Sequence, residues 1–201
     1  MYQYNMKTLD DLLRYAKDVD KFMEMEEFFN KRTERHINLV RKYCDKIHNY
    51  YPDQFEGIIE RGEEHDQSKY ADPEVIPYIY ITWDYRCKDL GIDPGISDEI
   101  HDEMNAASEH HVHNNRHHPE FFCNEKSTIN REDRDAVPDK IIDATEMDDL
   151  DIAEMVADWW AMSEEKGDKS PKAWADKNVN KRWKFTKEQK NLIYELIDAL
   201  S

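Results

Sequence analysis

Five of the nine histidines in the chain fall within residues 110–118, in the segment HHVHNNRHH. Imidazole is the commonest metal ligand in proteins and the side chain whose charge changes most easily near neutral pH. The segment is internal and irregular, so it is not a purification tag. It indicates a metal site, a pH-sensitive site or a polar surface, and the choice depends on partners elsewhere in the chain.

Polar residues on apolar helix faces supply candidate partners. His36 lies on the stripe formed by Leu39, Val40, Tyr43 and Ile47, and His65-Asp66 follows a similar stripe of residues 55–62. Asp158 lies near the middle of a late helical segment, in MVADWW. Taken singly, such a histidine is more often a hydrogen-bonded core residue, and such an aspartate is more often solvated.

The order of these residues is more specific than any one of them. A histidine, then His-Asp, then a histidine-rich segment and a late aspartate in a helical chain resembles the ligand order of the HD-domain superfamily of metal-dependent phosphohydrolases. HDQSK (65–69) resembles its H-D-x-x-K motif. Together with HHVHNNRHHPEFF and MDDLDIAEMVADWWAMS, it also resembles an HD-like family of phages and bacteria. The resemblance covers about residues 36–163.

The resemblance implies a metal centre and assigns its ligands. They are His36, His65, Asp66 and Asp158, with a second ion held by members of the set His110, His111, His117 and His118. Imidazoles and carboxylates suit one or two divalent transition-metal ions such as Mn, Fe, Co, Ni or Zn, or else Mg. Such an ion polarises a phosphoryl oxygen and activates water. Asp66, Lys69 and Arg116 are the expected catalytic residues, the two cations neutralising phosphate oxygens.

Three functions remain open at this point. The first is a metal-dependent phosphohydrolase that acts on a small phosphorylated metabolite, with a nucleotide as the first candidate. The second is a di-iron oxygenase of the HD type, which the same ligands permit. The third is a non-enzymatic acidic interaction protein whose histidines are structural.

The elements that position these residues are predicted to be helices. Apolar periodicity indicates helices over about 8–29, 31–50, 54–69, 72–88, 97–113 and 145–165, followed by helices over about 171–200. The expected N-terminal caps are Thr8, Ser97, Thr145 with Asp148, and Thr186 with Gln189. Residues 114–137 have no clear period. The chain is therefore expected to be an all-α, HD-like helical bundle in one domain, 1–201, with its motif-bearing core at about 31–165.

Composition narrows the possible partners. The formal net charge of −17 disfavours long nucleic acids and anionic membranes, but a bound metal can still attract a small anion. Three widely spaced cysteines predict a reducing compartment. The N-terminal residues lack the apolar segment of a signal peptide. We therefore expect a cytoplasmic protein of a bacterium or a phage-infected host cell, with a small-molecule substrate.

Overall fold

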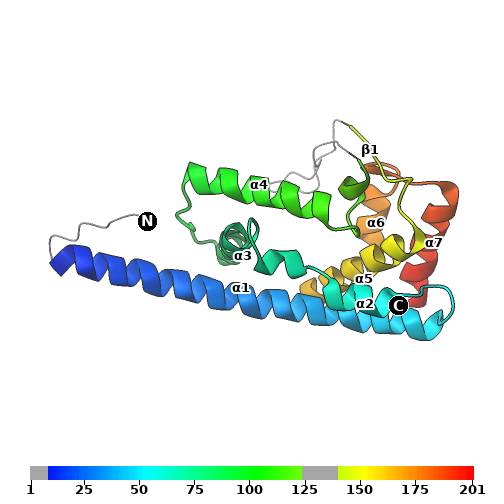
Figure 1. Cartoon of the computed structure of the whole chain (residues 1–201), viewed down its shortest axis with the longest axis horizontal. Helices are drawn as coiled ribbons and strands as arrows, with labels where there is room; N and C mark the ends of the chain where they lie inside the picture. The colour runs from blue at the N-terminus through cyan, green and yellow to red at the C-terminus, as the bar shows by residue number, and fades with distance from the viewer. Residues whose placement is uncertain (1–8, 124–139) are drawn as a thin grey trace.

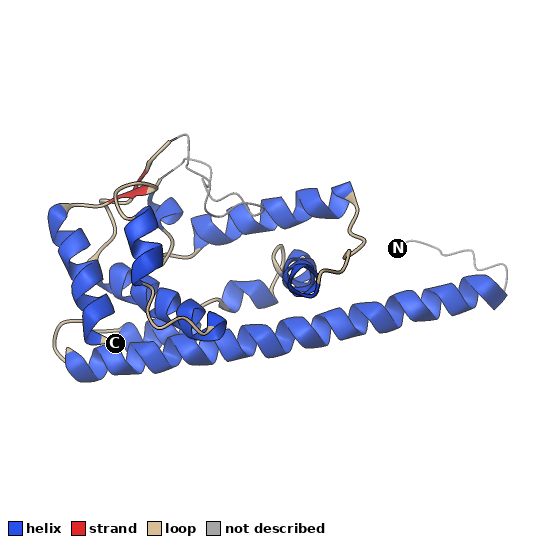
Figure 2. Ribbon diagram, turned by 180° about the vertical axis from the view of Figure 1, so that it is seen from behind, coloured by secondary structure: helices blue, strands red, loops and turns tan. Residues whose placement is uncertain are grey.

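The computed structural model describes residues 9–123 and 140–201, and helices dominate both ranges (Figures 1 and 2). The α-helices are α1 (Leu9–Tyr50), α2 (Ile58–Glu64), α3 (Val75–Leu90), α4 (Asp98–Asn114), α5 (Asp149–Lys166), α6 (Lys172–Asn178) and α7 (Lys187–Ala199). Two short 3-10 helices, η1 (Gln67–Tyr70) and η2 (Pro119–Phe122), and two short strands complete the described elements. The predicted all-α class is confirmed.

Helix α1 is continuous, so the predicted break near residue 30 is wrong. Residues 9–50 contain neither proline nor glycine, and nothing in them interrupts the helix. The buried stripe runs through the expected break, because Met25, Phe29 and Thr33 lead at helical spacing into His36 and Val40. At ~1.5 Å per residue the helix is about 63 Å long, and it runs the length of the molecule (Figure 1).

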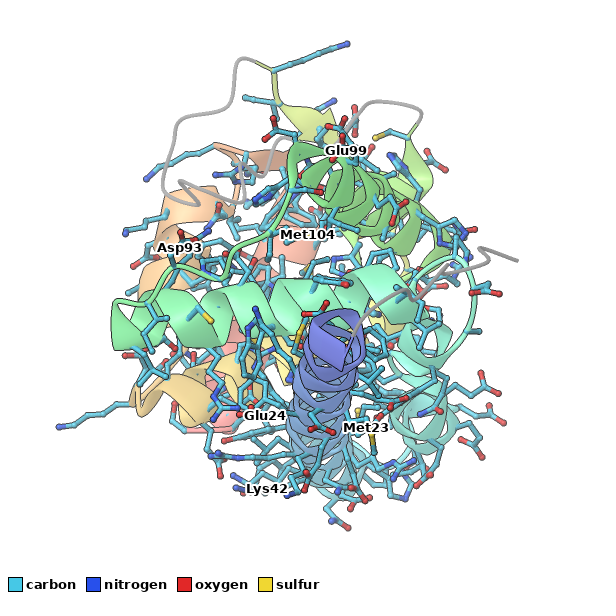
Figure 3. The ribbon with its side chains drawn as sticks, turned by 90° about the vertical axis from the view of Figure 1, so that its left-hand side faces the viewer. Met23, Glu24, Lys42, Asp93, Glu99 and Met104 are labelled. Atoms are coloured by element: carbon cyan, nitrogen blue, oxygen red, sulfur yellow. The ribbon has the colours of Figure 1, made fainter. Side chains whose placement is uncertain are left out.

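The other helices pack at two places along α1. Helix α3 lies between α1 and α4, as Figure 3 shows in a view along α1. Its contact with α1 is a small apolar cluster of Met25, Phe29 and Ile79. Helix α5 packs along the C-terminal half of α1, and α7 packs on α5. The main core lies there, and its fully buried side chains include Ile47 and Ile193.

Helix α2 is shorter than predicted. It was expected over 54–69, and it begins at Ile58 and ends at Glu64. His65 has an extended backbone (φ −53°, ψ 130°), and Asp66 has a left-handed one (φ 59°). The chain therefore turns at the His-Asp pair before η1 begins. Gly62 lets α2 approach α1 closely, since a Cβ atom there would lie 3.1 Å from Cys44 Cβ. This approach brings His65 toward His36.

Helix starts were predicted with mixed success. Ser97 caps α4, and Thr186 and Gln189 form a capping box at α7, as expected. Helix α3 starts at Val75 rather than at 72. The capping box of α5 is formed by Asp148 and Asp151, not by Thr145, because Thr145 donates to Asp143 instead. The cap expected at Thr8 lies outside the described residues.

A two-residue parallel strand pair was not expected. Strand β1 (Ile142–Asp143) pairs with β2 (Trp183–Lys184), with Ile142 opposite Trp183. The pair connects the segment before α5 to the segment between α6 and α7. Within 9–123 and 140–201, no helix is both long enough and apolar enough to cross a bilayer.

Candidate metal centre

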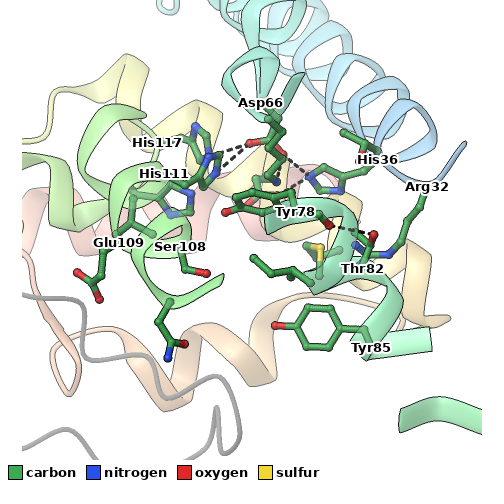
Figure 4. Close-up of a pocket in the computed structure, with 18 residues that line it drawn as sticks. Arg32, His36, Asp66, Tyr78, Thr82, Tyr85, Ser108, Glu109, His111 and His117 are labelled. Carbon is green, nitrogen blue, oxygen red and sulfur yellow. Dashed lines mark hydrogen bonds and ion pairs between the residues drawn. The ribbon is translucent and has the colours of Figure 1, made fainter. Parts of the chain in front are cut away.

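Six of the eight predicted ligands line one cavity of about 440 Å³. Helices α1, α3, α4 and α5 contribute to its walls, as do η1 and the segment after α4 (Figure 4). His36, Asp66, His111, His117, His118 and Asp158 all line it. Residues separated by more than 120 positions in the sequence therefore face the same space.

Asp66 lies at the centre of the cluster. Its Oδ2 atom is 3.7 Å from His36 Nε2 and 3.6 Å from His65 Nε2. Its Oδ1 atom is 3.1 Å from His111 Nε2 and 3.8 Å from His117 Nε2. One carboxylate therefore faces a pair of histidines with each oxygen.

The first subsite contains His36, His65 and Asp66, whose ligand atoms all lie within 4.8 Å of one another. Asp158 completes it from α5, with Oδ1 3.0 Å from His36 Nε2 and 4.0 Å from His65 Nε2. These four residues are the ligands that the HD-like order predicted, and the structure brings all of them together.

The second subsite contains His111, His117 and His118, whose nitrogens also lie within 4.8 Å of one another. Helix α4 ends at Asn114, so the last two histidines do not lie on it. A turn closed by the bond from His118 N to Asn115 O (3.0 Å) brings them back beside His111. The rings of His117 and His118 are 4.2 Å apart.

Carboxylates lie behind the histidines and orient them. Glu154 Oε1 lies 2.9 Å from His65 Nδ1 and 3.1 Å from His117 Nδ1. Glu74 Oε2 lies 2.9 Å from His111 Nδ1. In each case the Nδ1 atom donates to a carboxylate, so the Nε2 atom is turned toward Asp66. Metal-binding histidines usually have such a partner.

Two arginines hold the acids at the start of α5. Arg61 donates to Glu154 Oε2 at 2.9 Å. Arg116 donates to Asp151 through Nε (2.9 Å) and Nη2 (2.8 Å), and it lies outside the cavity lining. The structure therefore does not bring Arg116 to the site. Its guanidinium is bound to Asp151, and the predicted contact with phosphate would require it to leave that carboxylate.

Lys69 and His110 occupy different positions relative to the site. Lys69 lines the cavity, forms an ion pair with Asp66 Oδ2, and lies over the Tyr78 ring at 5.1 Å. His110 is partly exposed, outside the lining, and bonded through Nδ1 to Glu74 Oε1 at 2.7 Å. Of the four clustered candidates, His111, His117 and His118 reach the centre and His110 does not.

The electrostatics keep the carboxylates charged. Burial opposes ionisation of Asp66, but the charges of Lys69, His65 and His111 hold its pKa well below the usual range. Burial also opposes ionisation of Asp158, and His36 outweighs it, so the pKa of Asp158 is lowered. Ionised carboxylates are the form that binds metal.

The clustered histidines differ in the direction of their pKa shifts. Burial disfavours the charged form of His111, but contacts with Asp66 and Glu74 outweigh it and raise its pKa. Burial lowers the pKa of both His117 and His118, so these imidazoles are neutral. Burial also disfavours the charged form of His36, but bonds to Asp158 and Glu165 outweigh it and raise its pKa to about 9. The proton on His36 would leave when a cation binds.

Three buried atoms indicate that this site fits a cation. His65 Nε2 and His118 Nε2 are buried without a hydrogen-bond partner within the described part of the chain, and buried Asp66 Oδ1 has the ion-pair contact with His111 Nε2 but no hydrogen bond. Unsatisfied buried polar atoms are rare and costly. His65 and Asp66 belong to one cluster of possible ligands and His118 to the other, and such nitrogen and oxygen atoms suit a divalent ion.

Several residues around the centre were not predicted from the sequence. Glu154, four residues before Asp158, lies at helical spacing with it and was expected at the surface or behind the ligands. Glu165 follows Asp158 by two turns, so its direction could have been inferred from period alone. Glu74 gave no such signal, because its contact with His111 depends on how α3 meets α4. Arg32, which precedes His36 by one turn, lines the cavity and was not considered.

Comparison with known proteins gives one match. A family model described as a family of unknown function (DUF5662) matches residues 25–199, which is most of the chain and includes every residue of the site. No curated protein and no solved structure matches.

Proposed function

This chain belongs to DUF5662, a family of unknown function, and from its cavity we propose that it is a metal-dependent phosphohydrolase. The substrate is a small phosphorylated metabolite, with a nucleotide as the first candidate. The observation that carries the proposal is the position of Asp66, whose two oxygens each face a pair of histidine Nε2 atoms. The proposal includes distant membership of the HD-domain superfamily, which the convergence of His36, His65, Asp66 and Asp158 supports.

The backbone at Asp66 supports a functional role for this residue. Its φ of 59° lies in the left-handed region, which non-glycine residues rarely occupy. Such conformations gather at functional sites, where the surroundings hold them in place. The conformation turns the Asp66 carboxylate into the space between the two histidine groups.

The proposed reaction is hydrolysis of a phosphate ester. The oxygen of water forms a bond to phosphorus, the bond between phosphorus and the ester oxygen breaks, and the leaving oxygen takes up a proton. When bound, divalent ions supply Lewis-acid polarisation of the phosphoryl oxygens and a nucleophilic water. His36, His65, Asp66 and Asp158 would hold one ion, and His111, His117 and His118 would hold a second beside Asp66.

We assign to Lys69 the binding of the substrate's phosphoryl group. Its ammonium lies within the cavity and beside Asp66 Oδ2. With Asp66 as a metal ligand, the Lys69 ammonium would be available to an anionic substrate at the same place. The net charge of −17 repels long polyanions, so a small substrate with few phosphates is favoured.

The first test combines metal analysis with a hydrolysis screen. Protein loaded with Mn, Co, Ni or Mg should release phosphate or pyrophosphate from a panel of nucleotides, and Asp66→Asn should abolish the release. A di-iron oxygenase is the second candidate, because a histidine-rich pair of subsites bridged by a carboxylate also suits iron. Absence of hydrolysis, together with oxygen consumption by an iron-loaded sample, would replace the first candidate with the second.

A further inference from the structure

The cavity continues well beyond the metal ligands. On its α3 side the lining residues are Tyr78, Ile81, Thr82 and Tyr85, which recur at helical spacing. Tyr78 lies beside His111, with ring centroids 5.4 Å apart. Tyr85 follows seven residues later, about 10 Å farther along the helix axis. Figure 4 accordingly draws Tyr85 at the end of the cavity away from Asp66.

A second cation lines the same cavity from α1. Arg32 precedes His36 by one helical turn, and its side chain is 35% exposed. Its only ion-pair partner within the described ranges is Glu165, with Nη2 and Oε2 4.0 Å apart, at the limit of an ion pair. Arg116, by comparison, makes two short bonds to Asp151. Arg32 is therefore better placed than Arg116 to bind an anion in the cavity.

We infer that Arg32 is the second phosphate-binding cation of this cavity, beside Lys69, and that the α3 wall of Tyr78, Ile81 and Tyr85 binds the aromatic part of the same phosphate ester. This inference rests on the proposed phosphohydrolase function and names its substrate class. A guanidinium binds two phosphate oxygens in a fixed bidentate geometry, whereas a lysine ammonium acts as a point charge. The phosphoryl group would then lie between Arg32, Lys69 and the metal ligands.

The shape and chemistry of the wall select the organic part of the substrate. Two tyrosine rings and an isoleucine present apolar surface along about 10 Å of helix. A planar base can cover that surface and stack on a tyrosine ring, whereas a sugar phosphate would leave it in contact with water. Pockets of this kind combine apolar walls with a few polar groups that fix orientation.

The phosphate contact is tested by binding of inorganic phosphate to the full-length, manganese-loaded protein. Arg32→Gln should weaken binding about tenfold or more, since hydrogen bonds to charged groups contribute that much. Arg35→Gln is the matched control. Arg35 is exposed on the same helix, and its charge, like that of Arg32, lowers the pKa of Glu165. Unlike Arg32, it does not line the cavity. It should change binding less than about twofold. Manganese content should be the same in all three proteins.

The aromatic contact is tested by comparing AMP with inorganic phosphate. Tyr85→Ala should weaken binding of AMP and leave binding of phosphate unchanged, while Tyr85→Phe should retain both. Equal effects of Tyr85→Ala on the two ligands, or no effect on AMP, would overturn the aromatic assignment. Normal phosphate binding by Arg32→Gln, or loss of its manganese, would overturn the role of Arg32.

These outcomes differ from failure of the proposed function itself. If wild-type protein hydrolyses nucleotides while Arg32→Gln binds phosphate normally, only the inference about Arg32 fails. If the manganese-loaded wild type neither binds phosphate nor hydrolyses any nucleotide, the proposed function and the inference fail together.

Discussion

The Nδ1 atom of His65 lies 2.9 Å from Glu154 Oε1, so the Nε2 atom of the same ring faces Asp66 and Asp158. Glu154 is buried, and its carboxylate contacts Arg61 through Oε2 and both His65 and His117 through Oε1. Burial opposes its ionisation, but bonds to His117 and His65 outweigh this and lower its pKa to about 2. A charged acceptor behind a histidine fixes the tautomer and makes the other nitrogen a better ligand.

Glu154→Gln should therefore weaken metal binding about 10- to 100-fold, as loss of such an acceptor typically does. Competition with a chromogenic chelator would measure the affinity. Glu164→Gln is the control, since Glu164 lies on the same helix but binds Lys42 and Tyr43 at the surface. If both variants bind metal as tightly as the wild type, the orienting role of Glu154 is wrong.

Lys69→Ala should separate metal binding from turnover. Lys69 occupies Asp66 Oδ2, the oxygen that faces His36 and His65. Its removal takes away a competitor for the ion, so metal affinity should stay the same or increase. Turnover should fall at least about tenfold, because a charged contact with the phosphate is lost. Metal titration and steady-state kinetics measure the two effects, and loss of metal in Lys69→Ala would disprove the role.

A buried acid outside the centre gives a prediction about pH and stability. Glu120 is fully buried, its Oε1 accepts from Trp183 Nε1 at 3.0 Å, and its Oε2 has no partner within the described ranges. Burial raises the pKa of this carboxyl above its usual value near 4.5. The folded state therefore holds the proton more tightly than the unfolded state does. Stability from this group is complete below pH 4.5 and is lost as pH rises through the folded pKa.

Glu120→Gln keeps the acceptor for Trp183 and cannot ionise. It should raise the unfolding free energy on the order of 1 kcal/mol at pH 8 and change it little at pH 4. Urea denaturation at both pH values measures the difference, with the exposed Glu56→Gln as the control. A variant that is less stable than the wild type at pH 8 would show that the charged form of Glu120 is the stabilising one.

The sequence allowed the clustering of the candidate ligands to be predicted better than their surroundings. His36 and Asp158 lie inside long helices, so apolar period indicates that both face inward. His65 and Asp66 were expected on a helix, yet they lie just after one. Period cannot predict this, because Asp66 adopts a left-handed backbone that local propensity disfavours.

The clustered histidines show the limit of sequence reasoning. His117 and His118 reach the centre because α4 ends at Asn114 and the chain turns back. Arg116, in the same turn, points instead to Asp151. The difference depends on how the turn packs against α5, and such tertiary contacts leave no periodic pattern in the sequence.

The central claim is that Asp66 connects two metal subsites while Asp158 serves only one. Elemental analysis of manganese in wild type, Asp66→Asn and Asp158→Asn tests it most directly. Asparagine tolerates the left-handed backbone of residue 66, so the variant should fold, and circular dichroism checks this. We expect two ions per chain in the wild type, none in Asp66→Asn, and one held by His111, His117 and His118 in Asp158→Asn. Equal metal content in a folded Asp66→Asn and the wild type would contradict the account.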